Sequence, residues 1–121
     1  MKKVLLVEDD PFMRDLTSVK LAEHDYAVVT CTSGESVIAM MQSEKPDVVL
    51  LDLDLPDLPG TDIVKYAKAD ASISSIPIII FSNNDDPSIH TAISEFGITD
   101  FFVKATTSFD DLLVRIKELT A

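Results

Sequence analysis

The sequence has a single cysteine, no tryptophan and only three glycines among its 121 residues. Cys31 has no second cysteine to pair with, so no internal disulfide can hold the fold together. So little glycine excludes a collagen-like or glycine-rich chain. No apolar stretch approaches the roughly 20 residues of a membrane helix, and the N-terminus lacks the pattern of an export signal. We therefore expect a cytoplasmic globular protein.

Positive charge is also scarce: 10 Lys and Arg against 21 Asp and Glu give a net charge of −11. This excess repels nucleic-acid phosphates and anionic membranes, so we expect no direct binding to either. Most of these acids are expected to serve solubility. Several, however, lie at or just beyond predicted strand ends, where a metal cation could use them: Glu8, Asp9, Asp10, Asp52, Asp54 and Asp57.

Five short apolar runs predict strands in a chain that is 46% hydrophobic and of single-domain length, residues 1–121. These runs are Val4–Val7, Tyr26–Cys31, Asp47–Leu51, Ile78–Phe81 and Asp100–Val103. The second run is the most polar, which is typical of an edge strand.

Apolar residues between the strands recur at helical spacing. The predicted helices run from about Pro11 to Glu23, Gly34 to Lys45, Thr61 to Ala69, Pro87 to Gly97 and Phe109 to Leu119. Met13, Leu16 and Val19 form the expected inner face of the first helix, and Phe96 belongs to that of the fourth. Strict alternation predicts an α/β fold, a doubly wound five-stranded parallel sheet with five helices on both faces. Alternation alone does not give the strand order.

Four of the five predicted strands end in a chemically useful group. Glu8 and Asp9 follow the first, Asp52 the third, Ser82 the fourth and Lys104 the fifth. In a parallel sheet these ends lie along one edge, where ligands of open α/β sheets bind. We therefore expect the five side chains to meet.

Asp52 is the expected nucleophile, because an aspartate can attack phosphorus to form an aspartyl-phosphate. Two carboxylates about 4 Å apart repel by roughly 4 kcal/mol at an effective dielectric constant near 20. The acids around Asp52 therefore call for a dication, and Mg²⁺ suits oxygen ligands and phosphate. Lys104 offers a positive charge to the phosphoryl oxygens, and Ser82 offers a hydroxyl donor.

The sequence resembles the receiver domain of bacterial two-component response regulators over essentially its whole length. The motifs that carry the resemblance occur in the family's order and spacing: Leu5-Leu6-Val7-Glu8-Asp9-Asp10-Pro11, Asp52-Leu53-Asp54-Leu55-Pro56 with Gly60, Ile79-Ile80-Phe81-Ser82, and Phe101-Phe102-Val103-Lys104. Each motif alone is weak, but the ordered set is specific. The resemblance implies a flavodoxin-like sheet with strand order 2-1-3-4-5.

The resemblance also implies a phosphorelay role. A sensor histidine kinase or phosphotransfer protein would phosphorylate Asp52, with Mg²⁺ held by Asp9, Asp52 and the backbone carbonyl of Asp54, and by Glu8 through water. Ser82 would turn toward the phosphoryl group and Phe101 would rotate inward. The surface formed by the fourth helix, fifth strand and fifth helix would then bind a downstream target protein or an output domain.

The sequence departs from the family pattern at Ala105, where members usually have a proline joined by a cis peptide bond. A cis bond to alanine costs about 2.5–4 kcal/mol, so the Lys104–Ala105 bond is expected either to be strained or to relax to trans. Asn83 is bulkier than the usual residue and is expected to restrict access to Asp52. Asp54 and Asn84 are expected to set the lifetime of the phosphorylated state.

We also consider an aromatic residue and two histidines as candidate functional residues. Phe101, in place of a common tyrosine, is either a moving switch ring or simply core. His24 and His90 are expected to be isolated, solvated surface residues.

Two alternatives remain open. Asp52 and Asp54 match the Asp-x-Asp signature of haloacid-dehalogenase-like phosphatases, with Asp110-Asp111 as the later acidic pair. That pair falls in a predicted helix rather than after a strand, and that fold leaves Glu8 and Asp9 unexplained. The other alternative is a degenerate receiver that serves only as a protein-interaction module.

Overall fold

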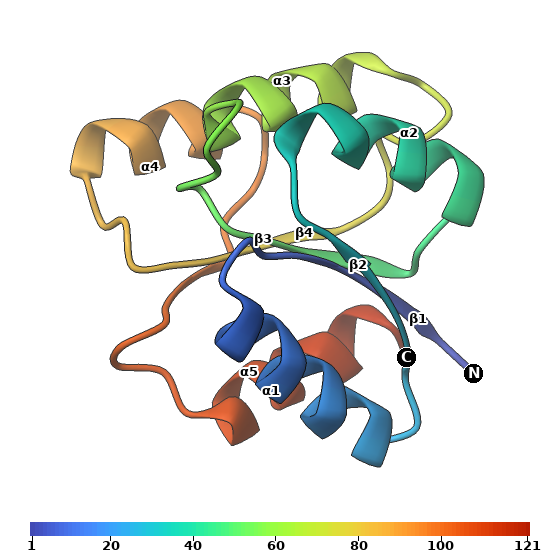
Figure 1. The fold of residues 1–121 in the computed structure, drawn as a ribbon. Coiled ribbons are helices and arrows are strands. Elements are labelled where there is room, and N and C mark those ends of the chain that lie inside the picture. Colours follow the sequence, from blue (N-terminus) through green and yellow to red (C-terminus); the bar gives the residue numbers. More distant parts are fainter.

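The structure is a computed structural model that describes residues 1–121, and its core is a five-stranded parallel sheet (Figure 1). The strands lie in the order β2-β1-β3-β4-β5, which confirms the order implied by the resemblance. Their bounds are β1 Lys3–Val7, β2 Ala27–Cys31, β3 Val48–Leu51, β4 Ile78–Ser82 and β5 Phe101–Val103. β2 is an edge strand, as its polar composition predicts.

Helices cover both faces of the sheet. α1 and α5 lie on one face, and α2, α3 and α4 lie on the other (Figure 1). Their bounds are α1 Pro11–Glu23, α2 Gly34–Glu44, α3 Gly60–Ala69, α4 Pro87–Ser94 and α5 Phe109–Leu119. No helix combines the length and the apolar character that crossing a bilayer requires. The predicted doubly wound architecture is confirmed.

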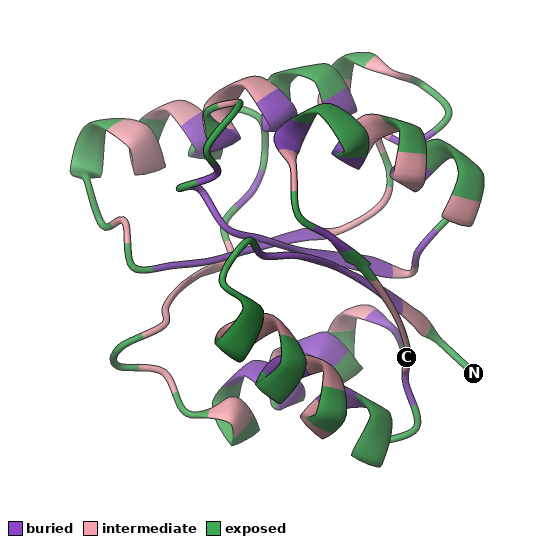
Figure 2. Ribbon diagram, viewed as in Figure 1, coloured by how far each residue is buried: buried purple, intermediate pink, exposed green.

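The core consists of two clusters, one on each face of the sheet; β3 and β4 are buried throughout, and β1 is buried from Val4 onward (Figure 2). Successive residues of β1 alternate between them: Leu5 and Val7 pack under α2, α3 and α4, while Val4 and Leu6 pack under α1 and α5. This alternation follows from the two-residue period of a strand and explains why the central strands read as continuous apolar runs.

The predicted inner face of α1 is correct at Met13, which packs against the core, but wrong at Leu16 and Val19. Leu16 and Val19 are 39% and 57% exposed, whereas Thr17 and Leu21 are buried. The buried side chains of Thr17 and Leu21 are four residues apart and so lie on one side of the helix. Because Thr17 is polar, the spacing of apolar residues did not identify this side.

The fourth helix also ends earlier than expected. α4 stops at Ser94, which leaves Phe96 outside the helix and 40% exposed. Gly97, with φ of +86°, still provides the left-handed position expected of a glycine stop.

The loop between β3 and α3 is fixed at two points. The Asp57 carboxylate accepts hydrogen bonds from the backbone N–H groups of Gly34 (2.7 Å) and Glu35 (2.9 Å), so it caps α2 from another loop. These bonds hold the pKa of Asp57 below its ordinary value. At the other end, a Cβ at Gly60 would lie 2.4 Å from Leu53 Cδ2 and 3.0 Å from Leu53 Cα, so a larger residue would have to displace the buried Leu53 and press on its backbone. The segment that follows Asp52 is thereby held in place.

Candidate functional site

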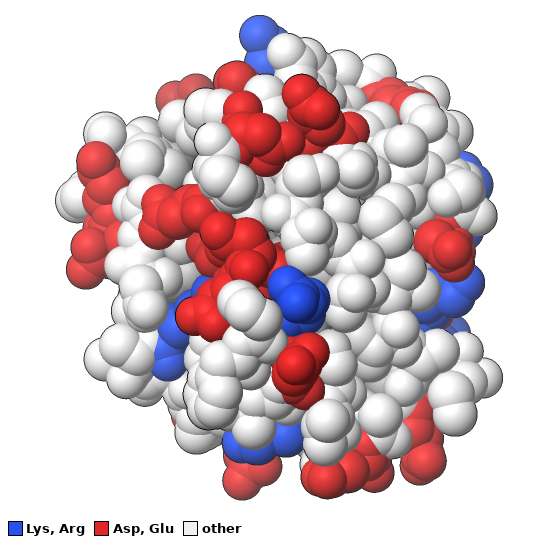
Figure 3. Space-filling model, in the orientation of Figure 1, with Lys and Arg blue, Asp and Glu red and all other residues white.

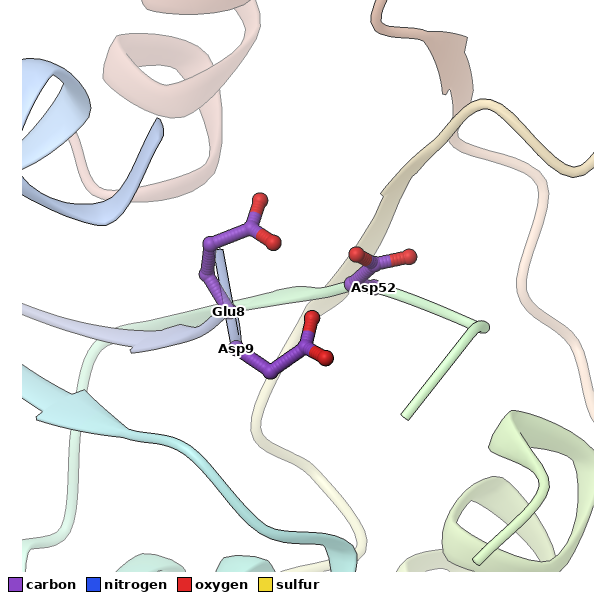
Figure 4. Close-up of side chains that lie close together, drawn as sticks. All are labelled: Glu8, Asp9 and Asp52. Carbon is purple, nitrogen blue, oxygen red and sulfur yellow. The ribbon is translucent and has the colours of Figure 1, made fainter. Parts of the chain in front are cut away.

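The strand register brings the predicted site residues together at the carboxyl edge of the sheet. Val7 pairs with Leu51, so the next residues, Glu8 and Asp52, leave adjacent strands side by side. Glu8 and Asp9 project from the end of β1 toward Asp52 at the end of β3 (Figure 4). The expected convergence of these acids is confirmed.

The remaining two groups arrive from β4 and β5. Ser82 is the last residue of β4 and pairs with Val103, so Lys104 is the first residue beyond β5. The Lys104 N–H donates to the Ser82 carbonyl at 3.3 Å, which continues the ladder by one step. Ser82 and Lys104 therefore lie side by side at the ends of two paired strands.

Three donors surround the Asp52 carboxylate. Its Oδ1 accepts hydrogen bonds from Ser82 Oγ at 2.8 Å and from the backbone N–H of Asp54 at 3.1 Å. Its Oδ2 accepts from Lys104 Nζ at 2.9 Å. Asp52 is only 6% exposed, and Ser82 only 2%. The carboxylate is thus buried and fully engaged, as a charged group must be when it leaves water.

Lys104 is shared between two acids. Its ammonium group donates to Glu8 Oε1 as well as to Asp52, and its side chain is 9% exposed. It also lies over the ring of Phe81, 5.8 Å from the ring centre. Glu8 Oε2 accepts the backbone N–H of Asp10 at 3.3 Å, so both Glu8 oxygens have partners.

Burial and charge pairing act in opposite directions on the ionisable groups. Burial alone would raise the pKa of Asp52, but hydrogen bonds from Lys104, Asp54 and Ser82 outweigh it and hold that pKa below its ordinary value. Burial likewise opposes the charge of Lys104, yet the two carboxylates raise its pKa. For Glu8, burial prevails over Lys104 and raises the pKa. Asp52 is therefore the acid that the pocket keeps ionised.

The pocket carries more negative charge than Lys104 can offset. Glu8, Asp9 and Asp52 each offer a carboxylate oxygen, and these oxygens lie within 4.8 Å of one another. Against one ammonium group they leave two negative charges uncompensated. Acidic side chains also gather on the face that Figure 3 shows. Hard carboxylate oxygens so grouped fit a small divalent cation.

The loops around the pocket are joined by side chains. Asn84 Nδ2 donates to Asp54 Oδ1 at 3.0 Å, and the Asn84 N–H donates to Ser82 Oγ at 3.2 Å. Asn83 Oδ1 accepts the N–H of Ala105 at 2.8 Å. No peptide bond is cis, so the Lys104–Ala105 bond is trans, and Lys104 still contacts Asp52. The relaxed alternative is the one found, and a cis bond is not needed to aim the lysine.

Sequence reasoning missed the environment of both histidines. The His90 ring stacks on Phe101, with ring centres 4.4 Å apart, and His90 Nε2 lies 3.0 Å from the Asn84 carbonyl oxygen. His24 stacks on Phe109 at 5.9 Å. The expectation of isolated histidines is therefore wrong, and His90 is half-buried, but His24 is exposed as expected. Each partner ring belongs to another element, Phe101 to β5 and Phe109 to α5, and no local pattern in the sequence reports such a contact.

The fold and the site together define a class of phosphoacceptor signalling domains, and comparison with known proteins gives the family. The family model of the response regulator receiver domain matches residues 4–117. The chain belongs to this family and is a receiver domain of two-component response regulators.

The curated relatives that this chain matches differ greatly in length. The chain is 31% identical over 104 residues to protein PilH of Pseudomonas aeruginosa, covering 86% of each. It is 28% identical to the CAI-1 autoinducer sensor kinase/phosphatase CqsS of Vibrio cholerae, but spans only 15% of that protein, and it spans 39% of the probable transcriptional regulator ycf27 of Guillardia theta.

Solved structures of receiver domains superpose closely. The BeF3-activated N-terminal receiver domain of Klebsiella pneumoniae RstA is 31% identical, with a TM-score of 0.88 and 98% of each chain covered. The chemotaxis response regulator CheY4 of Vibrio cholerae is 26% identical, with a TM-score of 0.86 and the same coverage.

The phosphatase alternative is not favoured. Asp110 and Asp111 lie in the first turn of α5, where Ser108 caps the helix, and not after a strand. Glu8 and Asp9, which that fold leaves unexplained, instead contribute two of the three carboxylates of the pocket.

Replacing Lys104 by methionine, which keeps an unbranched side chain one atom shorter and removes the charge, is expected to lower the free energy of unfolding by about 3–5 kcal/mol. The cause is that Glu8 and Asp52 are left as adjacent buried carboxylates. Urea denaturation followed by circular dichroism at pH 7 measures the change. The control, Lys117→Met on the exposed side of α5, should stay within about 0.5 kcal/mol of wild type.

The same variant should change how stability depends on pH. In the wild type the pKa of Asp52 is lowered, so its contribution is present above the unfolded-state pKa of about 3.9 and is lost as pH falls through the folded pKa. Without Lys104 burial dominates, that pKa rises, and stability falls as pH rises through it. The difference between the two proteins should therefore widen from acidic to neutral pH; a constant difference would contradict this account.

Proposed function

We propose that Asp52 is the phosphoacceptor of this receiver domain, spanning residues 1–121, and that a phosphohistidine on a sensor histidine kinase or phosphotransfer protein is the donor. The observation that carries the proposal is the set of contacts to Asp52: a buried carboxylate kept ionised by Lys104 and bonded to Ser82. An ionised carboxylate is the form that attacks phosphorus.

In the transfer, an Asp52 oxygen forms a bond to phosphorus while the phosphorus–nitrogen bond of the donor breaks. The donor imidazole keeps the electron pair of that bond. Lys104 retains its proton and lies where it can pair with a phosphoryl oxygen, and Ser82 Oγ can donate to another. The chain accepts one phosphoryl group for each such event, so we infer a phosphoacceptor role rather than an enzyme activity.

We infer that Mg²⁺ is the cofactor, held by Asp9, Asp52 and the backbone carbonyl of Asp54, with Glu8 acting through water. The three clustered carboxylates and their uncompensated charge support this assignment. When bound, the ion supplies positive charge that neutralises the phosphoryl oxygens. Asp9 is exposed and has no side-chain partner among the hydrogen bonds of the site, so it is free to serve as a ligand.

Phosphorylation is proposed to act on the surface formed by α4, β5 and α5. Ser82 ends β4, and Phe101 begins β5 with its ring half-buried against His90 of α4. A phosphoryl group that binds one arrangement of Ser82 and Phe101 better than another shifts the population toward it. The altered surface would bind a downstream target protein or an output domain, in a cytoplasmic setting and without direct contact to nucleic acid.

We propose that Asp54 and Asn84 set the lifetime of the phosphorylated state. Their hydrogen bond joins the loop after β3 to the loop after β4, on the solvent side of Asp52. Asn84 is also bonded through its N–H to Ser82 Oγ. A bridge in this place limits the approach of water to a phosphoryl group on Asp52.

The phosphoacceptor assignment is tested by mass spectrometry after incubation with Mg²⁺ and either a histidine kinase or acetyl phosphate. Wild type should gain the mass of one phosphoryl group on the peptide that contains Asp52, and Asp52→Asn should gain none. Asp85→Asn, an exposed residue of the β4–α4 loop, should behave as wild type. Equal labelling of Asp52→Asn would contradict the assignment, and no labelling of wild type by any kinase would leave only the interaction-module alternative.

The lifetime proposal predicts that Asp54→Ala and Asn84→Ala each speed the loss of phosphoryl about 2- to 10-fold, the effect of one hydrogen bond. Because both variants break the same bridge, the double variant should be little faster than either single one. The decay is followed by intact-mass spectrometry after the donor is removed, with Asp85→Ala as the control. Rates equal to wild type would remove these residues from that role.

A further inference from the structure

Lys104 reaches its partners from a short stretch of backbone that is anchored on both sides. The peptide group before it donates through the Lys104 N–H to the carbonyl of Ser82 at 3.3 Å. The peptide group after it donates through the Ala105 N–H to Oδ1 of Asn83 at 2.8 Å. Two consecutive residues of the β4 end thus hold the two peptide groups that flank Lys104.

This arrangement limits rotation about both backbone bonds of Lys104. A peptide bond is planar, so fixing the two flanking peptide groups fixes the φ and ψ angles between them and hence the direction of the Cα–Cβ bond. The lysine side chain is long and flexible and has many rotamers, so its ammonium group is not placed by its own stiffness. A fixed starting direction is therefore valuable for a group that must contact both Glu8 and Asp52.

The second anchor is a side chain and not a strand. β5 ends at Val103, and beyond it the chain turns, with the N–H groups of Thr106 and Thr107 both donating to the Val103 carbonyl. The ladder between β4 and β5 could not reach Ala105 through backbone groups, because the chain after Ser82 leaves toward α4. The Asn83 carboxamide extends the ladder by one further bond.

We propose that Asn83 is a positioning residue for Lys104: through the N–H of Ala105 it fixes the backbone that aims the lysine at the phosphoryl group transferred to Asp52. This inference rests on the proposed phosphoacceptor function. In this role Asn83 affects the phosphorylation rate in the direction opposite to that of a residue that blocks access to Asp52. A gate slows the reaction when present, whereas a positioning residue speeds it.

The test compares Asn83→Ala with wild type in two measurements. Hydrogen exchange followed by nuclear magnetic resonance reports the Ala105 amide directly, and this amide should exchange faster in Asn83→Ala. Asn83→Asp keeps an acceptor oxygen at the same place, so it should preserve the slow exchange. Asp85→Ala, in the same loop, should leave the exchange of Ala105 unchanged.

The second measurement is the phosphorylation rate with saturating acetyl phosphate and Mg²⁺. In this reaction the bond between phosphorus and the acetate oxygen breaks, acetate leaves with the electron pair, and the bond from Asp52 to phosphorus forms. Asn83→Ala should react about 2- to 10-fold more slowly, the range expected for one hydrogen bond. Ala105→Ser, which keeps the backbone donor, should react as wild type. The Mg²⁺ affinity should be unchanged in Asn83→Ala, because the hydrogen bond of the Asn83 side chain goes to Ala105 and not to Glu8, Asp9 or Asp52.

Each outcome decides between the two roles of Asn83. A slower reaction with unchanged Mg²⁺ affinity supports the positioning role. A rate equal to or above that of wild type, or an Ala105 amide that exchanges no faster in Asn83→Ala, overturns it, and an accelerated reaction identifies Asn83 as a gate. Failure of wild type itself to accept phosphoryl at Asp52 from either donor would overturn the proposed function, a result distinct from these.

Discussion

The ammonium group of Lys104, shared between Glu8 and Asp52, is the interaction on which the rest of the site depends. Two carboxylates at the ends of adjacent strands would repel each other in a pocket with little water. Lys104 relieves part of this repulsion and, together with Ser82 and the Asp54 N–H, keeps Asp52 ionised despite its burial. The Asp52 carboxylate therefore stays charged because its neighbours, not solvent, stabilise its charge.

The fold supports this interaction by placing five strand ends along one edge of the sheet. The register of β1 with β3 brings Glu8 beside Asp52, and the pairing of β4 with β5 brings Lys104 beside Ser82. The two apolar clusters hold the strands at this register, since a slip of one residue would move every core side chain to the opposite face. Packing of the core thus fixes the positions of Glu8, Asp52 and Lys104.

Charge balance explains why the pocket is suited to a dication. Lys104 offsets one of the three negative charges contributed by Glu8, Asp9 and Asp52. A phosphoryl group would add further negative charge at the same place. A divalent cation held by these carboxylates would compensate this charge.

The sequence predicted well what depends on neighbouring residues and poorly what depends on distant ones. The strands, the helices and the five strand-end groups follow from local periodicity and turns, and all are found, although α4 ends before its expected end. The strand order came only from the family resemblance. The contacts of His90 with Phe101 and of Asn83 with Ala105 join different elements or loops, and no local pattern reports them. The exposed face of α1 was mistaken because a polar residue, Thr17, faces the core.

The most direct test of this account is the ionisation of Asp52 in the metal-free wild-type protein. A titration of the side-chain carboxyl carbon of Asp52 by ¹³C nuclear magnetic resonance gives its pKa. We predict a value below the ordinary aspartate value of about 3.9, with the carboxylate ionised throughout the physiological pH range. A midpoint above that value would show that burial outweighs Lys104, Ser82 and the Asp54 N–H, and would contradict the claim that these neighbours stabilise the charge of Asp52.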